Sequence, residues 1–433
     1  MRIAWPIILA NIAVPLLGVV DTAVIGHLGQ TAPLGAIAIG AQIFSFLYWG
    51  LGFLRMGTTG LTAQADGAGN AAEVRAALGR ALVIALALAA LLIALQWPLA
   101  AGAFMIFETS PEIERLAMSY FSIRIWGAPA TLVGYAVLGW LIGLRDSRSV
   151  LVLQVFLNAL NIALDLLFVV GFGWGVRGVA IGTLISEWSA ALLALALVSF
   201  KLRSSGSLRG APAVSLPGLL EPRPLLATLR INQDIFLRTV LLISAFAWFT
   251  RQGARAGDAV LAANHVLLQF LAFSAFFLDG FAFATEALVG QAVGGESRER
   301  LRRAVRLSSN LAVATATATT LAFAVLGSAI VDALTNVAEV REVARRFLPY
   351  AALHPIVGVW CFQLDGIFIG ATRTADMRNA MIVSFGVYLG LWWLLWGSLQ
   401  NHGLWIAFLV FFMVRGVTLA VRYPSLLRSV GNV

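Results

Sequence analysis

Long uninterrupted runs of apolar residues, rather than amphipathic stripes, dominate this chain. Examples are "ALVIALALAALLIALQWPLA" at 81–100 and "LLISAFAWF" at 241–249. A run of about 20 apolar residues is long enough to cross a bilayer as a helix. The pattern predicts an all-α polytopic membrane protein with twelve transmembrane helices, at roughly 3–25, 34–56, 75–99, 117–142, 149–170, 177–200, 229–250, 259–288, 304–330, 347–370, 378–399 and 403–421.

An even number of spans places both termini on one side of the membrane. When Lys and Arg are counted over alternating loops, one side collects 19 and the other 7. Cytoplasmic loops of membrane proteins carry the excess of basic residues. We therefore expect both termini in the cytoplasm of a bacterial inner (plasma) membrane.

Composition agrees with this pattern and excludes other classes. The 433 residues are 60% hydrophobic and only 12% charged, with a mean hydropathy of +0.88, whereas soluble proteins are about 25% charged. The net charge of +9 is spread over short clusters between apolar runs, so we expect no nucleic-acid partner. The lone Cys361 excludes a disulfide framework. The initial apolar run continues to about Val24, so we expect a first span rather than a cleaved signal peptide.

The two halves of the chain are related by a constant offset. Shifted by 227, "TTGLTAQADGAGNAAEVRAAL" (58–78) aligns with "TEALVGQAVGGESRERLRRAV" (285–305), and "GWLIGL" (139–144) with "GIFIGA" (366–371). A polar segment rich in Ser, Gly, Pro and Arg lies between the halves. We predict an N-terminal six-helix lobe (1–200), a cytoplasmic linker (201–228) and a C-terminal six-helix lobe (229–433). Two pseudo-symmetric bundles around a central cavity are an architecture of secondary transporters.

Polar residues inside the predicted spans are the candidates for function, because a charge at the centre of a membrane helix costs about 2.5–3.5 kcal/mol on insertion scales. Asn161 and Asp165 are four residues apart in one span, so they share a helix face. Asp21 lies at a similar predicted depth, and Thr183 lies in the next span. Two carboxylates close together in a low dielectric cannot both stay ionised cheaply. These residues therefore predict a site that takes a proton or Na⁺.

Other polar residues in the spans could line the substrate cavity. They are Gln42, Asn158, Glu187, Asn264, His265, Gln269, Asp279, Gln363 and Asp365. No Cys/His cluster suggests a metal enzyme and no phosphate loop suggests ATP-driven pumping. We therefore expect no cofactor beyond a coupling ion, H⁺ or Na⁺, and no enzymatic activity.

At these residues the sequence resembles the MATE (multidrug and toxic compound extrusion) family, in particular its DinF-type branch. The resemblance is carried by "PLLGVVDTAVIGHLG" (15–29), "NALNIALDLLF" (158–168), "GVRGVAIGTLISE" (175–187) and "LDGIFIGATRTADMRN" (364–379). It implies that Asp21, Asn161, Asp165 and Thr183 form the cation-coupling site of the N-terminal lobe. It also implies a hinge in the first helix at Pro6, with Pro15 as a second candidate.

The resulting hypothesis is a cation-coupled antiporter that exports apolar or cationic small molecules by alternating access, as a monomer in the lipid bilayer. One alternative is a lipid-linked-precursor flippase of the same superfamily, for which we expect extra spans and several arginines in the cavity. We expect neither here, because the arginines of this chain concentrate in the predicted loops. A second alternative, an intramembrane aspartyl protease, lacks its expected Tyr-Asp and Gly-x-Gly-Asp motifs.

Overall fold

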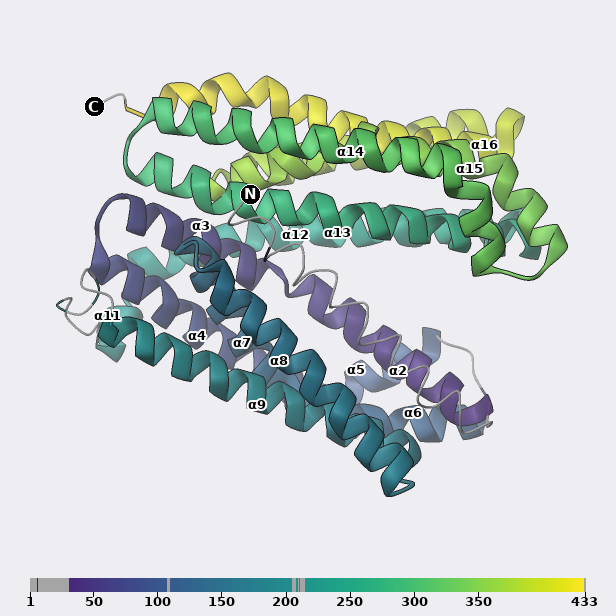
Figure 1. Cartoon of the computed structure of the whole chain (residues 1–433), viewed down its shortest axis with the longest axis horizontal. Coiled ribbons are helices and arrows are strands. Elements are labelled where there is room, and N and C mark those ends of the chain that lie inside the picture. The colour runs from purple at the N-terminus through teal and green to yellow at the C-terminus, as the bar shows by residue number, and fades with distance from the viewer. Residues whose placement is uncertain are drawn as a thin grey trace. The chain divides into compact units, whose positions relative to one another are not determined.

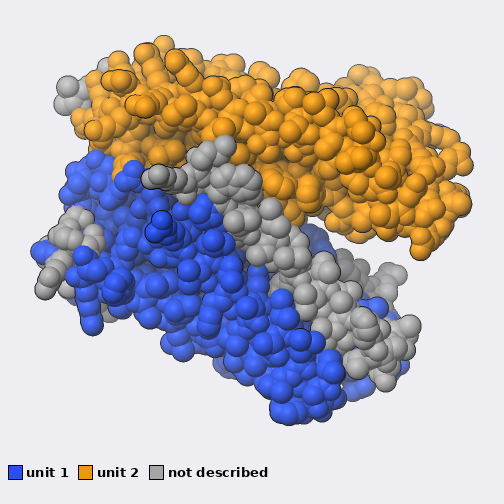
Figure 2. Space-filling view, in the orientation of Figure 1, with its two compact units in different colours: residues 1–229 blue, residues 230–433 orange. Residues whose placement is uncertain are grey.

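The structure, a computed structural model, describes residues 6, 31–106, 110–204, 208, 210 and 215–431. The chain divides into two compact units, Met1–Leu229 and Arg230–Val433, which Figure 2 shows in blue and orange. Every regular element printed in Figure 1 is a helix. The described part of the chain thus has the all-α architecture that its apolar runs predict.

The helices of the first unit follow the predicted spans closely. They are α2 (Thr31–Gly50), α3 (Phe53–Gly67), α4 (Ala71–Ala94), α5 (Gln96–Ile106), α6 (Pro111–Arg124), the short 3₁₀ segment η1 (Ile125–Gly127), α7 (Ala128–Gly143), α8 (Ser147–Asp165), the π-helical segment η2 (Leu166–Gly171), α9 (Gly175–Ser204) and the one-turn α11 (Leu216–Leu219). Side chains cap several of these helices, since Asn70 accepts a hydrogen bond from the backbone N–H of Glu73 and Ser110 accepts one from Ile113.

The second unit is built from fewer and longer helices. They are α12 (Pro222–Arg255), whose first residues precede the unit boundary, α13 (Asp258–Gly294), α14 (Arg298–Leu334), α15 (Ala338–Gly370) and α16 (Thr374–Ser429). The predicted spans 378–399 and 403–421 both lie in α16, which leaves helical geometry at Gln400 (φ 46°, ψ −122°). The ring of Tyr388 lies 5.8 Å from Phe408 and 5.7 Å from Phe411. The chain therefore turns back on itself at Gln400, and the two spans pack together.

Ten helical segments of the described residues are long and apolar enough to cross a membrane. The predicted span 3–25 lies outside the described residues, apart from the single helical residue Pro6. The merging of two spans into α16 accounts for the remaining difference from twelve. The prediction of an all-α membrane protein is therefore confirmed.

The internal repeat is visible in the backbone of each unit. A Cβ on Gly139 would meet the carbonyl oxygen of Arg55, and one on Gly366 would meet that of Ala282. Gly139 and Gly366 are 227 residues apart in the sequence, and so are Arg55 and Ala282. Helix α7 therefore packs on α3 as α15 packs on α13. Residues with positive φ repeat at the same offset, as at Gly69 and Glu296, Arg145 and Thr372, and Gly173 and Gln400. Because glycine allows two helix backbones to approach closely, the sequence offset reports a real repeat of helix packing.

Candidate functional site

Helices α8 and α9 run side by side in the first unit and bring together three of the four predicted coupling residues (Figure 1). The side-chain Nδ2 of Asn161 on α8 donates a hydrogen bond of 3.1 Å to Oγ1 of Thr183 on α9. The Thr183 hydroxyl in turn donates to the carbonyl oxygen of Val179, at 2.9 Å. Asn161 has no exposed surface and Thr183 is 3% exposed. This chain of hydrogen bonds fixes both side chains in the interior of the unit.

Asp165 lies one turn beyond Asn161 on α8 and is also fully buried. A Cβ placed on Gly182 would lie 2.6 Å from Oδ1 of Asp165. Glycine at 182 therefore gives the carboxylate room to approach the backbone of α9. Directly after Asp165 the helix widens into the π-helical segment η2. Such π turns are rare and often occur at functional sites.

The chemistry of this set is that of a hard-oxygen site. Oδ1 of Asn161 has no hydrogen-bond partner among the described residues, although it is fully buried. Together with the Asp165 carboxylate and the Thr183 hydroxyl, it supplies the oxygen types that suit Na⁺, and the carboxylate can also accept a proton. Asp21 and Pro15 lie outside the described residues, and Pro6 is helical and partly buried. Their predicted roles stay predictions.

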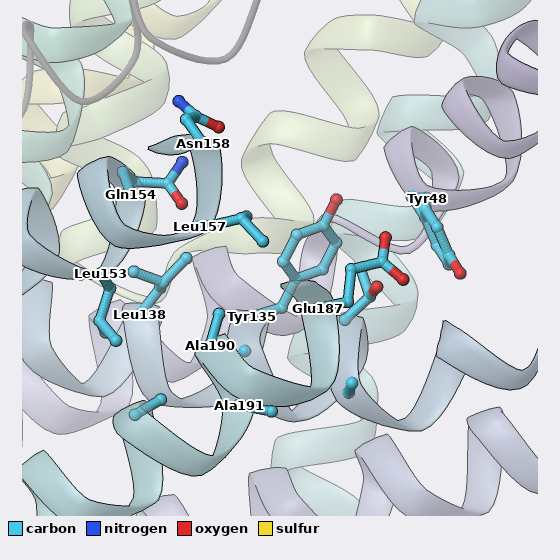
Figure 3. A pocket seen from close by; sticks show the side chains of 14 residues that line it. Tyr48, Tyr135, Leu138, Leu153, Gln154, Leu157, Asn158, Glu187, Ala190 and Ala191 are labelled. Atoms are coloured by element: carbon cyan, nitrogen blue, oxygen red, sulfur yellow. The ribbon is translucent and has the colours of Figure 1, made fainter. Parts of the chain in front are cut away.

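A cavity of about 300 Å³ opens beside this set, between α2, α7, α8 and α9. Figure 3 shows Tyr48, Tyr135, Gln154, Asn158 and Glu187 around it, with leucine and alanine side chains completing the wall. Two of these polar residues, Asn158 and Glu187, are predicted cavity residues. Its size lies at the lower end of the range of small-molecule pockets, and its apolar wall with a few polar groups is typical of them.

The cavity and the coupling set are built on the same two helices. Asn158 precedes Asn161 by about one turn of α8, and Glu187 follows Thr183 by one turn of α9. Residues three or four apart on a helix lie on neighbouring parts of one face. A shift of α8 against α9 at Asp165 would therefore also move the wall of the cavity.

Glu187 is held by an ion pair that the sequence does not reveal. Nη2 of Arg124, on α6, donates to Oε1 of Glu187 at 2.7 Å. The Arg124 guanidinium also lies over the ring of Phe44, 5.1 Å from its centroid, and Nη1 donates to the hydroxyl of Tyr120. The side chains of Arg124 and Glu187 are only 9% and 11% exposed. A buried pair of this kind is strongly coupled, because removing one partner leaves the other charged in a low dielectric.

In the second unit, Asp365 on α15 is bound by two arginines. Oδ2 of Asp365 accepts a hydrogen bond of 2.7 Å from Arg415 on α16 and a further one from Arg238 on α12. All three residues are at most 7% exposed. The buried His354 lies near this cluster, with its Nδ1 3.3 Å from the hydroxyl of Ser274. The cluster thus joins three helices of the unit through ion pairs.

The remaining predicted cavity residues have varied surroundings. Nδ2 of Asn264 donates to Oδ1 of Asn401, while Oδ1 of Asn264 accepts from Asn401 and from the indole of Trp405. Gln363 donates to the hydroxyls of Thr285 and Ser308. Asp279 is partly buried, and the exposed residues are Gln42, His265 and Gln269. None of these six residues lines the cavity of the first unit.

The expectation that arginines favour loops is wrong for three residues, Arg124, Arg238 and Arg415. Each is at least 92% buried inside a membrane-spanning helix. Their positions in the sequence indicated burial, because they are three of the four arginines that are not counted with the predicted loops. In the structure each is paired with a carboxylate, which lowers the cost of burying its charge. In the part of the chain that the structure describes, no cluster of His, Cys, Asp and Glu could hold a metal ion.

Comparison with known proteins identifies the family. The MatE family profile matches residues 6–167 and 235–394. The chain is 41% identical to DNA damage-inducible protein F of Escherichia coli (strain K12) over 97% of this chain and 90% of that protein. It is 29% identical to the probable multidrug resistance protein NorM of Deinococcus radiodurans over 98% of this chain and 94% of the relative.

A solved structure described as MATE in the bent conformation has the same fold. It superposes with a TM-score of 0.88 over all of this chain and 96% of its own, at 18% identity. The two profile matches fall on the two repeats, and the sequence identity to the E. coli relative extends through α8, α9 and α15. The chain therefore belongs to the MATE family.

Proposed function

We propose that this protein is a secondary active exporter of apolar or cationic small molecules, driven by antiport of H⁺ or Na⁺. The observation that carries the proposal is the placement of a buried oxygen-rich set and a small-molecule cavity on the same two helices, α8 and α9. Relatives named as multidrug resistance proteins support the substrate class. They also favour transport over the protease alternative.

Asp165 is the residue that we expect to take the coupling cation, with Asn161 and Thr183 as neutral oxygen ligands. A charged carboxylate in the interior of a membrane protein is costly, so binding a proton or Na⁺ changes the local energy strongly. We expect the sequence-predicted partner Asp21 to share this cation. A helix bend at Pro6 or Pro15 would then accompany the change, since proline removes a backbone hydrogen bond.

Coupling requires the cation to bind the two transport states unequally. In our proposal, cation entry from the outside alters the packing of α8 on α9 near Gly182. Because Asn158 and Glu187 are one turn away on these helices, the cavity wall moves with them and the substrate is released outward. The protein would do this as a monomer in a bacterial inner membrane.

The flippase alternative receives less support, although buried arginines are present. Such a protein needs cationic groups free to bind an anionic lipid-linked headgroup. Arg124, Arg238 and Arg415 are instead engaged with Glu187 and Asp365. We therefore propose drug or toxin export rather than lipid flipping.

The test is efflux of the fluorescent cation ethidium from proteoliposomes with an imposed pH or Na⁺ gradient, each varied alone. Asp165→Asn keeps the size of the side chain but cannot bind or release a proton, so gradient-driven efflux should fall at least tenfold. Thr183→Val removes one oxygen ligand and should weaken the apparent affinity for the coupling cation several-fold, with a smaller loss of maximal rate.

Asp258→Asn provides a matched control, because Asp258 is exposed in the first turn of α13. This variant should transport like the parent protein. Full gradient-driven efflux by Asp165→Asn would rule out the proposed coupling site. Efflux that ignores both gradients in the parent protein would rule out cation antiport itself.

A further inference from the structure

Five arginines gather at the first three turns of α14, at positions 298, 300, 302, 303 and 306. Arg298 donates to the backbone carbonyls of Arg428 and Val430, which fixes the end of α16. The other four are not in ion-pair contact with any carboxylate among the described residues, and Arg302, Arg303 and Arg306 are exposed. The only acidic residue of the first turn is Glu299. With five arginines and one carboxylate, this end of the helix carries a net positive charge.

The charge lies over a groove between α13 and α14. Gln291 and Ala292 line it from α13, and Arg300, Arg303, Ala304 and Leu307 line it from α14; its volume is about 250 Å³. A second hollow of about 720 Å³ adjoins it, lined by four arginines and one carboxylate, Arg298, Glu299, Arg302, Arg303 and Arg306, and by Leu307. Polar and apolar side chains therefore meet in one depression at the end of a membrane-spanning helix.

Exposed apolar residues continue from this groove along one face of α14, interrupted by the exposed Asn310 and Thr317. At 100° per residue, Arg303, Leu307 and Val325 fall within about 40° of one face of the helix. Leu307 and Val325 are 55% and 79% exposed, and Leu321 on the same side is 61% exposed. A cationic end followed by an apolar strip matches the layout of a phospholipid, with its headgroup at one end and its acyl chains beyond.

The internal repeat shows that most of these charges are peculiar to the second unit, since only Arg302 has an arginine, Arg75, at the equivalent position. At the equivalent positions of α4, Glu73 stands in place of Arg300 and Arg80 stands in place of Leu307. Glu73 and Arg80 form an ion pair with each other. Gly79 replaces Arg306, and the side chain of Leu219 from α11 lies against it, 2.7 Å from where a Cβ would be. In the first unit this face thus has fewer free charges, and the linker covers part of it, since Arg75 donates to the carbonyl oxygen of Leu208.

Neither helix stability nor membrane topology explains the difference. Cations at the N-terminal end of a helix are unfavourable to its dipole. Topology depends on charge in the loop and does not require a groove or an apolar stripe. Basic clusters and pockets next to membrane helices are, however, suited to anionic lipid headgroups.

We propose that the groove between α13 and α14 binds an anionic phospholipid of the adjoining leaflet. The phosphate would lie against Arg300, Arg303 and Arg306, and an acyl chain would run along α14 from Leu307 past Ala314, which is also exposed. The charge count over the loops predicts that this leaflet is the cytoplasmic one. The proposal does not depend on the transported substrate or on the coupling cation.

The test is the thermal unfolding of the purified full-length protein in detergent with added lipid, with native mass spectrometry to count bound lipids. Phosphatidylglycerol should raise the unfolding temperature and remain bound as discrete adducts. Phosphatidylethanolamine and inorganic phosphate at equal concentration should do neither. Equal stabilisation by phosphatidylethanolamine or by inorganic phosphate would overturn the proposal.

Two variants test the location. Arg303→Gln/Arg306→Gln should bind phosphatidylglycerol at least fivefold more weakly. Ala304→Glu leaves every arginine in place, and with it the charge that sets topology, but adds a carboxylate to the groove and should have a similar effect. Arg148→Gln/Arg422→Gln removes equal charge from exposed positions on the same predicted side and should leave binding unchanged. Retained binding in both groove variants, or equal loss in the control, would overturn the proposal.

Discussion

Single residues in this protein show how a buried carboxylate is defined by its neighbours. Glu187 is held by Arg124, and Asp365 by Arg238 and Arg415. Breaking either ion pair should cost about 3–5 kcal/mol, because one charge would remain buried alone. Asp165 instead lies a turn from an amide–hydroxyl pair. Sequence spacing identified all three acidic residues, but only the contacts show which arginines hold Glu187 and Asp365.

A prediction at the residue scale concerns Asp146, which lies between α7 and α8. Partial burial favours the neutral form of Asp146 and by itself would raise its pKa. Asp146 also accepts hydrogen bonds from Lys201 (2.5 Å) and from the backbone N–H of Ser149. These hydrogen bonds and the charge of Lys201 outweigh burial, so the pKa of Asp146 lies below its usual value. When folding lowers the pKa of a carboxyl group, the ionised group stabilises the folded state at pH values above its unfolded-state pKa. This stabilisation is lost as the pH falls through the folded-state pKa.

We therefore expect Asp146→Asn, which keeps a helix-capping side chain, to lower the free energy of unfolding by about 0.5–1 kcal/mol at pH 6–7. The difference from the parent protein should shrink below about pH 4, near the usual pKa of aspartate. Thermal unfolding of both proteins at several pH values measures this. A deficit that persists unchanged at low pH would show that charge is not the cause.

At the scale of elements, the packing of α8 on α9 determines the geometry of the candidate coupling residues Asn161, Asp165 and Thr183. Gly182 lets α9 approach the Asp165 carboxylate, and η2 widens the helix directly beyond it. Neither feature follows from hydropathy, since both depend on the neighbouring helix. In our proposed mechanism, the cation acts by changing the distance between α8 and α9.

Gly182→Ala tests this distance directly. The added methyl group would lie 2.6 Å from Oδ1 of Asp165, so the carboxylate or the helix must move. We expect gradient-driven ethidium efflux to fall at least fivefold, while the protein still inserts and purifies. Gly102→Ala on α5 is the control, because no atom lies within 4 Å of its added Cβ and Gly102 does not line the cavity. Equal activity of both variants would contradict a role for this contact.

At the scale of the whole molecule, one six-helix plan is used twice with different chemistry. The glycine contacts and the positive-φ turns repeat at an offset of 227. The described oxygen-rich set and the cavity lie in the first unit, whereas the second unit has a carboxylate held by two arginines and the basic groove. We infer that duplication supplied the fold and that the polar residues of the two units diverged afterwards.

The charge asymmetry of the loops gives a prediction for the whole chain. Both termini, and the linker 201–228, should lie in the cytoplasm because they belong to the side with 19 basic residues. A fluorescent protein fused after Val433 should fluoresce in cells, and alkaline phosphatase fused there should be inactive. Active phosphatase at the C-terminus would reverse the assigned orientation.

The sequence alone determined the class of fold, the positions of most spans, the repeat and the pairing of Asn161 with Asp165 on one face. These follow from local rules, because the bilayer requires long apolar helices and a helix has a fixed period. Only the tertiary structure decided that Arg124, Arg238 and Arg415 neutralise buried carboxylates, that Asn158 and Glu187 line a cavity, and that α14 has an open basic groove. Each of these depends on which helices become neighbours, and long-range packing rather than local pattern sets that choice.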